Sequence, residues 1–271
     1  MALTDKLTAI ANAIRAKIGG TEKLSLDEMA STISNMQTGE IDYTVLEDII
    51  QRTVTNIELP EDLNITSIGS SAFSNYDTLV SISLPTKVTS ISSNAFKDCR
   101  RLVSISLPAG LTSISGYAFY GCYELTLASL PDGVTSIGPN AFTDCSKLAL
   151  TSLPAGITKI GSEAFRRCSN LALTSLPVGL TSIESSVFRG CSKLALTSLP
   201  AGITKIGEYA FVNCTRLITL TFKGTPTTID STAFSGCNIL STINVPWAEG
   251  AVSGAPWGAT NATINYNYTG K

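Results

Sequence analysis

The chain has 271 residues, and with 19 Lys and Arg against 21 Asp and Glu its formal net charge is −2. That balance lacks the basic surplus that nucleic-acid binding requires, and no apolar run approaches the ~20 residues of a membrane span. We therefore expect neither nucleic-acid binding nor membrane insertion. Histidine is absent, which removes the commonest general base and a frequent metal ligand.

Residues 1–38 have helical periodicity. Their apolar positions recur at i, i+4, i+7, i+11 and i+15, and Gly19 and Gly20 end the pattern. These positions are Leu3, Leu7, Ile10, Ile14 and Ile18. A capping box from Ser25 to Glu28 opens a second helix. Because short amphipathic helices are unstable alone, this module is predicted to dock on the rest of the chain, on a sister chain in a homo-oligomer, or on another protein.

Residues 39–60 are predicted to form an N-terminal cap. A further capping box, Thr44 to Glu47, opens a helix that leads into an extended pattern ending at Leu59 and Pro60. A stack of strands needs such a cap, because its open end would expose backbone donors and apolar side chains.

Residues 61–245 repeat with a fixed period of 23. The phenylalanines are Phe73, Phe96, Phe119, Phe142, Phe165, Phe188, Phe211 and Phe234. An isoleucine precedes each by five residues and a leucine follows each by six. A unit this short cannot bury its own apolar face, so the period predicts a solenoid of eight stacked units whose three apolar columns form the core.

Each unit contains two extended segments and a compact third one. In the second unit, residues 79–84 and 88–91 have the spacing of short strands, and Pro85 closes the first. Ala95, Phe96 and Cys99 stand at i, i+1 and i+4, which suits one helical turn with a buried side.

All seven cysteines belong to the repeat, three residues after a phenylalanine. An odd number cannot pair completely, and in-register side chains point the same way into one layer. We expect buried free thiols that fill space rather than disulfides or metal ligands. The structural core is therefore predicted to include Phe96, Phe119, Phe142, Phe165, Cys99, Cys122, Cys145 and Cys168.

Units three to six depart from this pattern. Ala128, Thr151, Thr174 and Thr197 occupy the position that Ile82 holds in the first repeat strand. Either small residues fill that core layer or the strand shifts its facing. We favour the shift, which turns Leu127, Leu150, Leu173 and Leu196 inward, because four exposed leucines in a row would form a large apolar patch.

The unit L-P-x-x-[VIL]-T-x-I-x-x-x-A-F-x-x-C-x-x-L resembles the BspA-type bacterial leucine-rich repeat, from about Val54 to Val245. The predicted fold is thus an α/β repeat solenoid, a leucine-rich-repeat-like stack of β-strand/β-strand/helical-turn units. The resemblance implies macromolecular recognition by bacterial or protozoal surface and adhesion proteins, or by components of phage particles.

Residues 246–271 break the period and are predicted to form a C-terminal cap. Thr263 to Tyr268 alternates like a strand. The aromatic side chains expected to seal the last turn are Trp247, Trp257, Tyr266 and Tyr268.

Both flanks of the repeat also resemble phage and prophage structural proteins. The N-terminal segment lacks the charged start and apolar run of a secretory signal, which fits a particle assembled in the bacterial cytoplasm. We therefore expect a tail-associated virion component whose N-terminal helices dock to the particle. The alternative is a bacterial cell-surface or host-interaction adhesin.

Carboxylates are scattered over different units and no phosphate-binding loop is present, so no catalytic, cofactor or metal residue is predicted. The residues around each phenylalanine vary most between units, and they could bind a protein or a glycan or could simply drift. The candidate contact residues are Tyr117, Tyr120, Tyr123, Arg166, Arg167 and Arg189, because Tyr and Arg are enriched at interface hot spots. A threonine in every unit, from Thr66 to Thr227, leaves ice binding as a further alternative.

Overall fold

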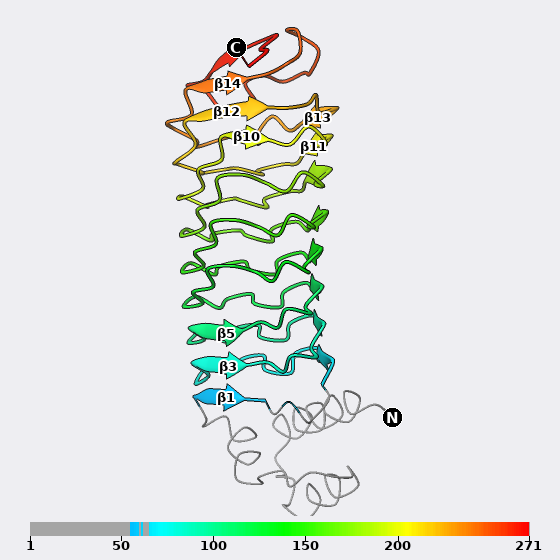
Figure 1. Ribbon diagram of the computed structural model, residues 1–271. Helices are drawn as coiled ribbons and strands as arrows, with labels where there is room; N and C mark the ends of the chain where they lie inside the picture. The colour runs from blue at the N-terminus through cyan, green and yellow to red at the C-terminus, as the bar shows by residue number, and fades with distance from the viewer. Residues whose placement is uncertain (1–54, 60, 62–64, 271) are drawn as a thin grey trace, which may run out of the picture.

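The computed structural model describes residues 55–59, 61 and 65–270, which form a parallel β-solenoid of about nine turns (Figure 1). The chain climbs the stack one coil at a time from β1 to the C-terminus. The predicted N-terminal helical module, residues 1–38, and most of the predicted cap, residues 39–60, lie outside the described residues.

Two sides of the solenoid carry the strands. The first side contains β1 (Asn56–Glu58), β3 (Ser81–Ser83), β5 (Ser104–Ser106), β10 (Ser198–Leu199), β12 (Thr219–Phe222), β14 (Thr242–Asn244) and β15 (Thr263–Asn265). The second side contains β2 (Ser67–Ile68), β4 (Ser90–Ile91), β6 (Ser113–Ile114), β7 (Ser136–Ile137), β8 (Lys159–Ile160), β9 (Ser182–Ile183), β11 (Lys205–Ile206) and β13 (Thr228–Ile229).

All strand pairings between coils are parallel, and those from β2 to β14 have the 23-residue offset of the repeat, unlike that of β1 with β3. Ile82 lies opposite Ile105 on the first side, and Ile91 lies opposite Ile114 on the second. The sheets have the orders β1-β3-β5 and β10-β12-β14-β15 on the first side, and β2-β4-β6-β7-β8 and β9-β11-β13 on the second. The buried isoleucines of the second side lie opposite one another in each of its pairings, so this core column is continuous within each sheet.

The predicted α/β class is wrong: the described residues contain no helix, and the third side of each unit is a corner built of tight turns. Asn94 and Asp98, on either side of Phe96, have φ of 58° and 56°. A residue in the left-handed region ends a right-handed helix, and here two such residues stand four positions apart in a unit.

Backbone hydrogen bonds at this corner run between coils. The N–H groups of Asn94, Phe96 and Asp98 donate to carbonyls of the next coil at 3.1, 2.8 and 2.7 Å. A helical turn would direct such bonds along its own axis. Asn, Asp and Gly adopt the left-handed conformation at low cost, and they hold the second of the two corner positions in every unit except that of Arg167.

The predicted core is confirmed. The eight phenylalanine rings form one stack, with neighbouring centroids 5.1–5.9 Å apart and ring planes within 17° of parallel. All of them except the half-buried Phe73 are buried, as are the isoleucine, leucine and cysteine columns. Because each ring lies between two others, the stack is a continuous hydrophobic spine.

The shift in the middle units is also confirmed. Leu150, Leu173 and Leu196 are buried, Leu127 is half-buried, and Thr151 is exposed like its counterparts in the neighbouring units. Side chains alternate along an extended segment, so a change of one residue in facing exchanges the buried and exposed sets. The ladder on the first side stops at β5 and resumes at β10, across these shifted units.

Two glycines allow coils of the second side to approach closely. A Cβ on Gly138 would lie 2.4 Å from the backbone nitrogen of Gly116, and one on Gly161 would lie 2.4 Å from that of Pro139. Neither site has room for a side chain unless the backbone moves.

The last coil closes on aromatic side chains. Trp257 is fully buried and Trp247 nearly so, and their rings lie 6.2 and 5.3 Å from that of Phe222. β15 pairs with β14, as the alternation after Thr263 predicts, with Ile243 opposite Ile264. The aromatic cluster covers the apolar interior where the repeat ends.

Candidate functional surface

The candidate contact residues follow the phenylalanine column. We call the residues one to five positions after each phenylalanine the turn edge; it contains all six candidates except Tyr117, which is two positions before Phe119. The corner turns and the between-coil hydrogen bonds fix the backbone here, so the side chains alone vary from coil to coil.

The three tyrosines, which we call the tyrosine cluster, belong to one coil, and two of their rings are in contact. Tyr117 and Tyr123 are each 40% exposed, and the Tyr117 and Tyr120 rings lie 5.8 Å apart. Lys97 reaches from the preceding coil to within 5.6 Å of the Tyr120 ring centroid. This cluster presents aromatic faces beside a cation, which suits recognition of a polar ligand.

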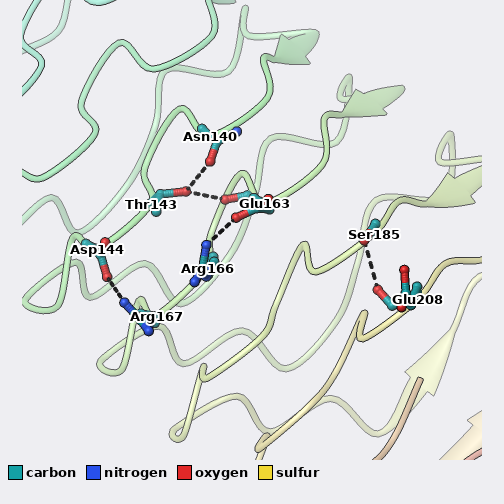
Figure 2. Close-up of polar contacts among 8 residues, drawn as sticks. All are labelled: Asn140, Thr143, Asp144, Glu163, Arg166, Arg167, Ser185 and Glu208. Carbon is teal, nitrogen blue, oxygen red and sulfur yellow. Dashed lines mark hydrogen bonds and ion pairs between the residues drawn. The ribbon is translucent and has the colours of Figure 1, made fainter. Parts of the chain in front are cut away.

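The arginines are engaged within the solenoid. Arg166 Nη1 donates to Glu163 Oε2 at 2.6 Å, and Arg167 Nη1 lies 3.5 Å from Asp144 Oδ1 (Figure 2). Arg189 lies over the ring of Tyr209, 5.5 Å from its centroid. Each guanidinium therefore has a partner already, which lowers its availability to a ligand.

The structure does not bring the tyrosines and arginines together. The unit of Phe142 separates them, and there Thr143 is buried and its hydroxyl donates to the Glu163 carbonyl at 2.6 Å (Figure 2). Asn140 Oδ1 lies 3.2 Å from the same hydroxyl. The predicted patch is thus two patches along one side.

Basic spots that are separate in the sequence, such as those at Arg101 and Lys193, belong to one row on the turn edge. Five positions after the phenylalanine the exposed cations are Arg101, Lys147, Lys193 and Arg216. The backbone N–H of Lys147 donates to the Tyr123 carbonyl and that of Lys193 to the Ser169 carbonyl, both at 3.2 Å, which holds the column in line. Aligning the units on the phenylalanine and comparing the residues at each position, instead of looking for adjacent basic residues, reveals the row.

The seven cysteine side chains are buried, as predicted, and none of them is in a disulfide. Each Sγ donates to the carbonyl of a phenylalanine in the preceding unit at 2.9–3.1 Å. Burial raises the pKa of the Cys145 thiol well above its usual value and that of Cys237 to about 11. Neutral thiols are poor nucleophiles and poor metal ligands. No group of three His, Cys, Asp or Glu within the described ranges could hold a metal ion.

Most hydroxyls of the threonine column on the second side donate to a carbonyl of the preceding coil. Thr112 Oγ1 donates to the Thr89 carbonyl at 3.0 Å, and Thr227 Oγ1 donates to the Thr204 carbonyl at 2.8 Å. These donors are not free for ordered water, which weighs against ice binding.

A broad open hollow lies beside β5, where the ladder of the first side stops. It is lined mainly by residues 126–132 and by Ile105 and Leu107. Its only ionisable side chain is Asp132, so it offers no acid–base pair.

No helix in the described part of the chain could cross a bilayer.

A model of the BspA type leucine rich repeat region matches residues 50–172 and 135–249. Among solved structures, the leucine rich repeat protein of T. pallidum is 35% identical, with a TM-score of 0.55 over 60% of this chain and 78% of its own. A leucine-rich repeat protein from Bacteroides ovatus is 22% identical, with a TM-score of 0.51 over 78% of this chain and 68% of its own, a likeness of fold. No curated protein matches the sequence.

These matches do not support the expected phage-like flanks or virion role, whereas proteins with this repeat are surface or binding proteins. The family match covers the repeat from end to end, and the T. pallidum protein shares both sequence and fold. The chain therefore belongs to the BspA-type leucine-rich repeat family.

Proposed function

We propose that this chain is a non-enzymatic recognition protein of a bacterial cell surface, which binds a protein or glycan of another cell through the outside of its solenoid. Its family of surface or binding proteins supports this, as does its similarity to the T. pallidum repeat protein. Leucine-rich-repeat solenoids usually bind proteins or glycans.

One observation carries the proposal: a uniform frame displays different side chains in each coil. One position after the phenylalanine the residue is Lys97, Tyr120, Thr143, Arg166 and Arg189 in successive units, while the phenylalanines themselves are stacked and unchanged. A frame fixed by backbone ladders needs little ordering when it binds, so more of the contact energy becomes affinity.

The state of the carboxylates favours binding over acid–base chemistry. Ser182 Oγ donates to Glu184 Oε1 at 2.7 Å, and this hydrogen bond together with Lys205 lowers the pKa of Glu184. Glu163 and Asp144 are in ion pairs with arginines. Carboxylates held by partners within the solenoid are structural groups rather than catalytic ones.

The tyrosine cluster provides the test. Labelled protein is expected to bind mammalian epithelial cells saturably in flow cytometry. Alanine at both Tyr120 and Tyr123 should weaken that binding by about tenfold or more, as expected for two hot-spot side chains. Tyr268→Ala, in the C-terminal cap, is the control and should leave binding unchanged. Absence of saturable binding, or equal loss in the control, would contradict the proposal.

A further inference from the structure

We propose that the turn edge binds an acidic glycan, a linear polysaccharide carrying sulfate or carboxylate groups, along the row formed by Arg101, Lys147, Lys193 and Arg216. The inference rests on the proposed recognition function and names the chemical class of the partner.

The first observation is that charge is segregated on the solenoid. The turn edge holds nine Lys or Arg and four Asp or Glu, a net charge of +5, whereas the rest of the described chain holds four Lys and eight Asp or Glu, a net charge of −4. The cations of the turn edge are Lys97, Arg100, Arg101, Lys147, Arg166, Arg167, Arg189, Lys193 and Arg216. A protein with a net charge of −2 thus carries one basic strip, which would attract and align a polyanion.

The second observation is that the row is free to act. Its four cations are exposed, and none forms an ion pair or a side-chain hydrogen bond with another residue that the structure describes. The neighbouring cations Arg166 and Arg167, by contrast, are paired with carboxylates of the solenoid. Unpaired cations in one line, with no structural partner, are the groups left to meet an external anion.

The third observation is the spacing. Lys147 and Lys193 occupy the same position two coils apart, so their backbones are separated by ~10 Å, twice the strand spacing of a parallel sheet. The half-buried Asn170 lies between them, and Arg216 continues the row one coil later. The exposed Glu124 holds the same position between Arg101 and Lys147, so the part of the row without a carboxylate runs from Lys147 to Arg216. A polymer with an anionic group at each regular repeat can follow such a row, whereas a compact ligand would meet one cation.

The surroundings of the row favour a sugar polymer over a nucleic acid. Tyr123, 40% exposed, is the backbone hydrogen-bond partner of Lys147 and offers a face on which a sugar ring can pack. The hydroxyls of Ser146, Ser169 and Ser192 form a ladder beside the row, each donating to the carbonyl of the preceding coil at 3.1–3.2 Å. Their oxygens remain acceptors for glycan hydroxyls. The negative remainder of the surface would repel a duplex that extends beyond the strip.

The test uses the full chain and four probes: heparin as the sulfated glycan, hyaluronan as the carboxylated glycan, dextran as the neutral one and a single-stranded oligonucleotide as another polyanion. The variant is Lys147→Gln with Lys193→Gln. The matched control is Lys159→Gln with Lys205→Gln, which removes the same charge from β8 and β11 on the second side. Circular dichroism and the melting temperature verify that all three proteins fold.

Heparin or hyaluronan should bind the unmodified chain, dextran should not, and affinity should fall as salt rises. The Lys147 and Lys193 variant should lose about tenfold or more in affinity, while the control should change by less than about twofold, because it lies outside the strip. Equal losses in both variants, oligonucleotide binding as tight as that of either glycan, or no binding of heparin and hyaluronan would each overturn the inference. If cell binding depends on Tyr120 and Tyr123 but not on these lysines, the acidic-glycan inference fails and the proposed recognition function stands.

Discussion

The two strand-bearing sides of the solenoid solve the same stacking problem differently. The second side repeats a two-residue strand in every unit and breaks its ladder only between β8 and β9. The first side loses its regular ladder across the shifted middle units, although Leu150, Leu173 and Leu196 are as deeply buried there as the isoleucines are in the outer units. The shifted units therefore keep most of their apolar burial, and single bonds between coils replace the regular ladder, such as that from the Ala172 N–H to the Leu150 carbonyl at 3.0 Å.

The difference follows from what the other sides supply. At the corner and on the second side, hydrogen bonds between coils continue through most of the stack, so the first side can change its facing without separating neighbouring coils. The corner and the second side hold neighbouring coils together, and the first side can therefore exchange which of its residues are buried.

The largest expected effect tests the shifted facing. Leu150→Ala should lower the free energy of unfolding by about 2–5 kcal/mol, because it leaves a cavity in a fully buried layer. Thr151→Ala, next to it and exposed, should cost less than about 0.5 kcal/mol. Chemical denaturation measures both. A larger cost at Thr151 than at Leu150 would mean that the middle units keep the facing of the outer ones.

A smaller effect is expected at the close approach on the second side. Gly161→Ala places a Cβ 2.4 Å from the backbone nitrogen of Pro139, so the coils must move apart, at a cost of about 1–3 kcal/mol. Gly156→Ala is the matched control, since its Cβ would meet nothing closer than 3.9 Å. Equal melting temperatures for the two variants would show that the coils at Gly161 and Pro139 are farther apart than in the structure.

The smallest effect concerns the corner and its thiols. The pKa of Cys237 is raised by burial from 9.0 to about 11, so an unfolded chain loses this proton first as pH rises. The stability contributed by the buried thiol is complete below about pH 9 and is lost as pH approaches 11, at up to about 1.4 kcal/mol per pH unit.

Cys237→Ala should therefore flatten the alkaline fall in stability by about one proton. Denaturation at neutral pH gives the packing cost of the same substitution separately. An identical alkaline slope in both proteins would show that this thiol ionises as readily in the fold as outside it.

The core could be predicted from the sequence because its information is repeated. The same residue type recurs every 23 positions in three columns, those of Phe96, Ile91 and Leu102. Only one stacking of the units brings all three columns into line. The facing of the middle units could also be predicted, since four leucines needed burial.

The corner was misread, because Ala95, Phe96 and Cys99 have the spacing of a helical turn. The contrary signal was present in Asn94 and Asp98, two residues before and after the phenylalanine, whose types favour the left-handed conformation. This preference is recognised as a regular feature only when the same two positions are compared across units.

The candidate surface was harder to predict than the core. Tyr120 and Arg166 share a column but stand two coils apart, and Arg166 is tied to Glu163, three residues earlier in the chain. Ion pairs across a turn depend on backbone geometry that composition does not reveal. The basic residues are visible in the sequence, but their alignment into a row is not, since they are distant in sequence and are brought into line only by stacking.

The uniform rise from coil to coil also bears on how such a chain changes over generations. The segments 148–161 and 194–207 are identical in sequence. Unequal crossing-over between their coding sequences would delete or add two whole units, and the flanking coils would meet with every aromatic ring and thiol again in line. Variation in copy number, rather than point substitution, is therefore the least disruptive route by which this molecule can alter its reach.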